Sequence, residues 1–314
     1  MVLSIPDREL IEVTAGGTRL RGTHHKSEDS ASRSNNPDHG LLFLNSGFMP
    51  RTAAGDTAVY WADSFARCGY SCFRFDLPGL GDSEGKLPAK RLDYAHLVNT
   101  GYYRAFISSL AKNLAERFNL AGIVIVGHCA GAVSAIYAAS ASRYIKGVLA
   151  LDPYFFEEDT PQTEIRAGMS RWATRSRLAG HLSKMYGGWK KMRQAAGPNK
   201  LPKNANVPLI RCWNQIASTG MPVLVLHARQ PRQGDFDYFA YLQASSRRAR
   251  GVSIKFIEGA SHSFAEPAAR MAVREQTESW LQACFPLNNR AQRSTTLLNQ
   301  REAAISGMTM RMTS

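Results

Sequence analysis

Short apolar runs alternate with helix-like stretches along most of the chain. The apolar runs lie at residues 40–44, 70–76, 123–126, 145–151, 222–227 and 253–257. Apolar residues recur at helical spacing over residues 56–68, 94–118, 130–141, 238–249 and 267–284, with a break expected inside 94–118. Strands that alternate with helices in this order predict a mostly parallel sheet covered by helices on both faces.

Two segments depart from the alternation near the N-terminus. Residues 10–14 and 18–24 flank Gly16-Gly17 and have the pattern of an antiparallel hairpin. The Ser- and Asn-rich segment 26–39 is expected to be a loop.

The pattern also changes between residues 153 and 208, which are basic and rich in Trp and Met, with Gly187-Gly188 and Gly197-Pro198 as breaks. We interpret this stretch as a cap inserted into a core made of residues 1–152 and 209–285. Residues 286–314 are polar with scattered Leu and Met, and are expected to form a loosely held tail.

Charge is concentrated in the insertion. The chain carries a net charge of +14, and residues 165–203 contain ten Lys or Arg and no Asp or Glu. Such a surface is either a solvated cationic face or a site for an acidic ligand. No helix-turn-helix, zinc-finger or aromatic RNA-binding pattern accompanies it, so nucleic acid is not an expected partner.

The apolar segments and the cysteines indicate the cellular compartment. The sequence has no apolar stretch long enough for a signal peptide or a membrane span. The five cysteines are odd in number and lack the pairing of zinc sites. We therefore expect a reduced, cytoplasmic protein that needs no metal or cofactor.

The segment Gly127-His-Cys-Ala-Gly131 joins an apolar run to an Ala-rich helical stretch. A strand, a sharp glycine-flanked turn and a helix form a nucleophile elbow, which exposes the central side chain over the edge of the sheet. Here that side chain is Cys129. Its position near a helix N-terminus favours the thiolate.

A base and an acid are expected on loops at the same sheet edge. His262, in Gly259-Ala-Ser-His-Ser-Phe264, follows the last apolar run and is the candidate base, whereas His128 is expected to line the pocket. Asp235 is the favoured acid because it follows the 222–227 run, with Asp237 and Asp152 as alternatives.

Acyl chemistry also needs donors for an oxyanion. The backbone N–H of Ala130, next to the nucleophile, is one candidate. The second belongs to Asn45-Ser-Gly-Phe-Met49, which follows the 40–44 run, with Phe48 the first choice and Met49 the next. Two fixed donors of this kind are worth a few kcal/mol each, roughly, in transition-state stabilisation.

With these motifs, and with the turn Asp76-Leu-Pro-Gly-Leu-Gly-Asp-Ser83, the chain resembles the α/β-hydrolase superfamily from about Leu10 to Cys284. Within it, the chain is similar to small bacterial hydrolases found with exosortase and exopolysaccharide systems. The resemblance implies an eight-stranded sheet, a triad of Cys129, Asp235 and His262, and a cap over about 153–208. Serine is usual at the elbow, and relatives with cysteine there include dienelactone hydrolases, polyhydroxyalkanoate synthases and some acyltransferases.

A thiol nucleophile would form a thioester acyl-enzyme, which passes its acyl group readily to an amine or another thiol. Together with the basic insertion, this favours a thioesterase, esterase or acyltransferase whose donor is an ester or a thioester of coenzyme A or an acyl carrier protein. The alternative is a binding protein of the same fold that has no catalytic activity.

Overall fold

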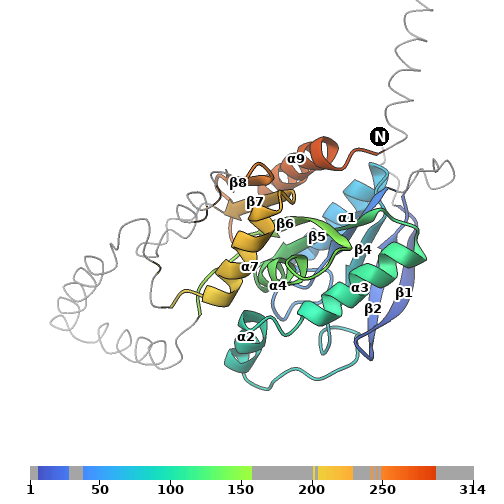
Figure 1. The fold of residues 1–314 in the computed structure, drawn as a ribbon. Helices are drawn as coiled ribbons and strands as arrows, with labels where there is room; N and C mark the ends of the chain where they lie inside the picture. The colour runs from blue at the N-terminus through green and yellow to red at the C-terminus, as the bar shows by residue number, and fades with distance from the viewer. Residues whose placement is uncertain are drawn as a thin grey trace, which may run out of the picture.

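The computed structural model of the chain describes residues 6–27, 38–157, 201, 204–228, 242, 246 and 249–287. Its centre is an eight-stranded sheet with the strand order β1-β2-β4-β3-β5-β6-β7-β8 (Figure 1). The strands are β1 (Arg8–Ala15), β2 (Thr18–His25), β3 (His39–Phe43), β4 (Cys72–Phe75), β5 (Gly122–His128), β6 (Ile145–Leu151), β7 (Val223–Ala228) and β8 (Val252–Ile257).

The sheet is antiparallel at one edge and parallel elsewhere. β1 and β2 form the predicted hairpin, in which Ala15 pairs with Thr18, and β2 also runs antiparallel to β4. From β4 across to β8 all neighbouring strands are parallel. The carboxyl ends of β3 to β8 therefore share one edge, where crossover loops meet.

Helices cover both faces of the sheet, as the apolar pattern predicts. The helices are α1 (Thr57–Arg67), α2 (Arg91–Asn99), α3 (Arg104–Arg117), α4 (Ala130–Ala139), α7 (Val207–Ser218) and α9 (Pro267–Cys284). Residues of α1 and α9, such as Phe65 and Leu281, share one buried apolar cluster with Val124 of β5. Residues of α3, α4 and α7, such as Trp213, form the other cluster with Ile125. Alternate side chains of β5 thus enter opposite cores, because a strand has a side-chain period of two.

The sequence located most of these elements. The break expected within 94–118 is present, because α2 ends at Asn99 and α3 begins at Arg104, with Gly101 between them at φ 75°. Helix α7 was missed, although Asn206 caps its N-terminus by accepting a hydrogen bond from the N–H of Leu209 (3.0 Å) and Pro208 lies in its first turn. Of the predicted helix 238–249, only residues 242, 246 and 249 are described.

The two ends of the inserted segment lie side by side. Phe156 and Ala205 form an isolated antiparallel bridge, and the N–H of Asn206 donates to the carbonyl of Phe155 at 2.9 Å. Within 153–208 the described residues are 153–157, 201 and 204–208, and residues 288–314 of the predicted tail also lie outside the described ranges. None of the helices in the described ranges is long and apolar enough to cross a membrane.

Candidate active site

Cys129 occupies a strained turn between β5 and α4. Its backbone has φ 54° and ψ −117°, a conformation that residues other than glycine rarely adopt. The surrounding structure holds it there, since its N–H donates to the carbonyl of Leu151 on β6 at 2.9 Å. The half-buried thiol therefore stands at the carboxyl edge of the sheet, at the first turn of α4, as the elbow motif predicts.

The two glycines of the motif are required by close backbone contacts. A Cβ atom at Gly127 would lie 2.4 Å from the carbonyl oxygen of Gly131. A Cβ atom at Gly131 would lie 2.4 Å from the carbonyl oxygen of Asn45, in the segment Asn45–Met49 that follows β3. We call this segment the oxyanion loop. Gly131 thus lets α4 and the oxyanion loop approach each other closely.

His262 reaches Cys129 and Asp152 at the same time. It lies in the loop between β8 and α9, its Nδ1 contacts Oδ2 of Asp152, and its side chain also interacts with that of Cys129. Asp152 follows β6 directly, has φ 47°, and is anchored by its N–H, which donates to the carbonyl of Leu226 at 2.8 Å. Asp152 is the acid that the described residues place against His262. Asp235 and Asp237 lie outside the described residues.

The charges in this cluster are strongly coupled. The hydrogen bond with Asp152, together with the interaction with Cys129, raises the pKa of His262 to about 10. Burial raises the pKa of Asp152, but its contacts with His227 and His262 outweigh burial and leave that pKa well below its usual range. With Nδ1 of His262 on the carboxylate, Nε2 is left for the sulfur. The carboxylate of Asp152 therefore favours the imidazolium form of His262.

His128 is neutral and has a structural role, and it is not placed to act as a base. Its Nε2–H donates to the carbonyl of His262 at 2.6 Å, so its Nδ1 must accept the hydroxyl hydrogen of Ser46 at 2.7 Å. Burial, with repulsion from His262, lowers the pKa of His128 to about 4. The sequence placed this residue in the pocket wall. In the structure it joins the oxyanion loop to the loop that carries His262.

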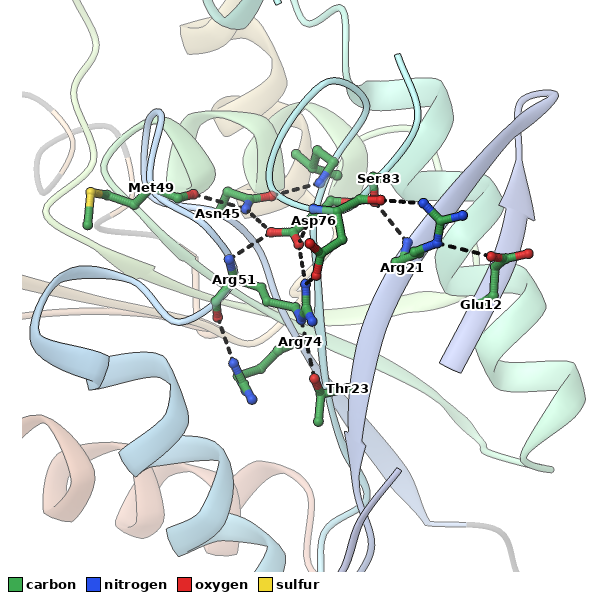
Figure 2. Close-up of polar contacts among 11 residues, drawn as sticks. Glu12, Arg21, Thr23, Asn45, Met49, Arg51, Arg74, Asp76 and Ser83 are labelled. Carbon is green, nitrogen blue, oxygen red and sulfur yellow. Dashed lines mark hydrogen bonds and ion pairs between the residues drawn. The ribbon is translucent and has the colours of Figure 1, made fainter. Parts of the chain in front are cut away.

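A buried carboxylate fixes the oxyanion loop from the other side (Figure 2). Asp76, just after β4, accepts hydrogen bonds from the amide of Asn45 (2.8 Å) and the backbone N–H of Arg51 (2.7 Å). The side chain of Asn45 also donates to the carbonyl of Met49 (3.0 Å) and accepts from the N–H of Leu77 (2.7 Å). Both side chains are fully buried or nearly so. The sequence motifs did not assign a role to Asn45 or to Asp76. A polar pair at the ends of two adjacent strands was the pattern that could have indicated their contact.

The two candidate N–H donors of the oxyanion loop differ in their hydrogen bonds. The N–H of Met49 donates to the carbonyl of Ser46 (3.1 Å), whereas the N–H of Phe48 has no acceptor within the described part of the chain. Ala130 is the first residue of α4, so its N–H has no acceptor within the helix. Tyr94 also holds the loop, because its hydroxyl donates to the carbonyl of Gly47 (2.8 Å) and its ring packs at a tilt against that of Phe48 with centroids 4.2 Å apart.

Within the described ranges, no group of three or more His, Cys, Asp or Glu side chains is arranged to hold a metal ion.

Comparison with known proteins gives a family and a fold. The sequence profile of the "Alpha/beta hydrolase family" matches residues 39–274. No curated protein matches the chain. Among solved structures, the Pyrococcus furiosus esterase PF2001 is 15% identical with a TM-score of 0.60, over 89% of this chain and 92% of that one. TT1662 from Thermus thermophilus is 17% identical with a TM-score of 0.55, over 88% of this chain and 99% of that one.

Proposed function

The chain belongs to the α/β hydrolase family, and on that premise we propose that it is an acyl-transferring or acyl-hydrolysing enzyme whose nucleophile is Cys129. The observation that carries the proposal is that His262 contacts both Cys129 and Asp152. In the proposed triad, Asp152 has the role of the acid.

The reaction would begin with attack of the Cys129 thiolate on the acyl carbon of an ester or thioester. The negative charge that develops on the acyl oxygen is met by the N–H groups of Phe48 and Ala130. The carbon–oxygen or carbon–sulfur bond of the leaving group then breaks, and the leaving group takes the proton of the His262 imidazolium. The products are a free alcohol or thiol and a thioester between the acyl group and Cys129.

In the second half, neutral His262 removes a proton from water or from an acceptor amine, alcohol or thiol as that group attacks the acyl-enzyme. The thiolate leaves and the imidazolium re-forms. A thiol nucleophile supports the transfer branch, because exchange between a thioester and a thiol is nearly balanced in free energy. The ten cationic residues of 165–203 support an acidic donor, such as a thioester of coenzyme A or of an acyl carrier protein.

The test is to incubate the protein with acetyl- and octanoyl-coenzyme A, an acyl carrier protein loaded with the same acyl groups, and p-nitrophenyl esters. Intact mass should reveal an acyl adduct that peptide mapping assigns to Cys129 and that is absent from Cys129→Ala. The His262→Ala variant should slow adduct formation by roughly 10²-fold or more, the range for a general acid–base group.

The competing proposal is a binding protein that keeps the fold without catalysis. It predicts an ordinary thiol whose alkylation by iodoacetamide does not change in His262→Ala, and no adduct from any of these donors. That pair of results would overturn the enzymatic proposal. The interaction between Cys129 and His262 favours the enzyme, because a binding protein has no need of it.

A further inference from the structure

A second histidine faces the same carboxylate. His227 is the penultimate residue of β7, and β7 runs parallel to β6 with Leu226 paired to Leu151. This register places His227 beside Asp152 at the carboxyl edge of the sheet. Nδ1 of His227 contacts Oδ1 of Asp152, while Nδ1 of His262 contacts Oδ2. The two oxygens of one buried carboxylate therefore each face an imidazole nitrogen.

The side-chain directions of β7 explain how His227 reaches this position. Leu224, Leu226 and Ala228 belong to the cluster that contains α1 and α9. Val223 and Val225 enter the opposite cluster, and His227 continues their face. Its ring meets the ring of Phe256 on β8 edge to face, with centroids 5.6 Å apart. His227 is thus held between two strands, with about a quarter of its side chain exposed (27%).

The contact has a mechanical consequence for Asp152. A carboxylate that is held at one oxygen can turn about its Cβ–Cγ bond, and this would carry the other oxygen away from its partner. An imidazole nitrogen against each oxygen restricts that rotation. Both contacts also stabilise the anionic form, since the pKa of Asp152 stays low despite burial that raises it. The contact that joins His227 to the candidate site is the one with Asp152.

We propose that His227 is a positioning residue, which holds Oδ1 of Asp152 through its Nδ1–H so that Oδ2 orients and charges His262. This inference rests on the proposed function, because it assigns His227 to the acid–base pair that serves Cys129. The family's three-residue triad becomes a chain of four groups, His227–Asp152–His262–Cys129. Outer partners of this kind typically change rates or affinities by about 10- to 100-fold when removed.

The test measures alkylation of Cys129 by iodoacetamide from pH 5 to pH 10, read by peptide mass so that the other cysteines do not interfere. In His227→Leu, Asp152 is no longer held against His262, so the midpoint of the pH profile should rise by about one pH unit. Below the midpoint, alkylation should then be roughly tenfold slower. The limiting rate at high pH should be unchanged, because the thiol ionises there without help. Asparagine carries a nitrogen at nearly the position of Nδ1, so His227→Asn should restore the wild-type midpoint.

Two further measurements separate position from folding. His227→Gln keeps polarity but moves the nitrogen outward, and it should behave like His227→Leu. A strongly downfield proton NMR signal, assigned to His262 Nδ1–H by its loss in His262→Ala, should survive in His227→Asn and broaden in His227→Leu.

The outcomes distinguish the two proposals. If His227→Leu, →Gln and →Asn all reproduce the wild-type profile while His262→Ala shifts it, the role of His227 is wrong and the proposed function stands. If His227→Asn is as impaired as His227→Leu, the role is likewise wrong. If the wild-type profile itself does not depend on His262, the proposed function fails first.

Discussion

The side chains of Asp152 and His262 meet although 110 residues separate them in the sequence. Asp152 stands directly after β6, and His262 lies between β8 and α9. The meeting depends on parallel strands whose carboxyl ends share an edge. It also depends on the positive φ of Asp152, which turns the chain at the end of β6.

The identity of the acid can be tested with paired substitutions. Asp152→Asn should slow acylation of Cys129 by roughly 10²-fold, because His262 loses the anion that orients it and raises its pKa. Asp235→Asn should change the rate by less than about threefold on the same general acid–base scale. Stopped-flow kinetics with p-nitrophenyl acetate would measure both. A larger loss in Asp235→Asn would return the role of the acid to the position that the sequence favoured.

The Gly131→Ala variant should separate the oxyanion donors from the thiol. The added Cβ would meet the carbonyl oxygen of Asn45 at 2.4 Å and push the oxyanion loop away from α4. Acylation should fall by roughly 10²-fold, the typical cost of losing one donor. Alkylation by iodoacetamide, which develops no oxyanion, should stay within about threefold of wild type.

A control for the steric part of this effect is Gly220→Ala, where φ is 72° and nothing lies within 4 Å of the added Cβ. Its positive φ should cost about 1–2 kcal/mol of stability, but its acylation rate should stay the same. Equal losses of acylation and alkylation in Gly131→Ala would mean that the substitution damages the whole elbow, and not the approach of the oxyanion loop.

The carboxylate of Asp76 should contribute strongly to stability. It is fully buried and pairs with Arg51 while it accepts from Asn45. Asp76→Asn leaves the Arg51 charge without its buried partner, so the free energy of unfolding should fall by about 3 kcal/mol. Urea unfolding followed by circular dichroism would measure it.

The control is Asp82→Asn, which removes the other carboxylate that contacts Arg51. The side chain of Asp82 is 65% exposed. Its loss should therefore cost less than about 1 kcal/mol, as is usual for exposed ion pairs. Similar costs for the two variants would contradict the assignment of Asp76 as the anchor of the oxyanion loop.

Two buried histidines predict loss of stability in mild acid. Burial, with the charge of Arg74, lowers the pKa of His25 to about 4, and burial lowers that of His128 to about 4, against an ordinary value of 6.5. Between pH 6.5 and 4 the unfolded chain therefore binds more protons than the folded one. The free energy of unfolding should decrease as pH falls through this window, by at most about 1.4 kcal/mol per pH unit for each histidine.

Urea unfolding at several pH values would measure this slope. His128→Gln should reduce it by about one proton. The same slope in the variant and the wild type would mean that His128 does not titrate in this way. His262 acts in the opposite range, because its raised pKa stabilises the folded state below pH 6.5 and this contribution is lost as pH rises toward 10.

The sequence by itself determined the fold and pointed to Cys129 and His262 as the candidate nucleophile and base. Strand and helix periods depend on local side-chain patterns, so the eight strands and the elbow of Gly127 to Gly131 could be read in order. Helix α7 was not predicted, because it begins where the basic, Trp-rich insertion ends. Asn206, which caps its N-terminus, was the residue that could have indicated its start.

Tertiary structure decided which polar groups meet. Three aspartates near the ends of strands were open as partners of His262, and only register and backbone turns bring the carboxylate of Asp152 to its Nδ1. The contact of His227 with the same carboxylate arises from the parallel pairing of β6 and β7. Such contacts depend on distances between strands far apart in the chain, which a one-dimensional pattern of residues does not contain.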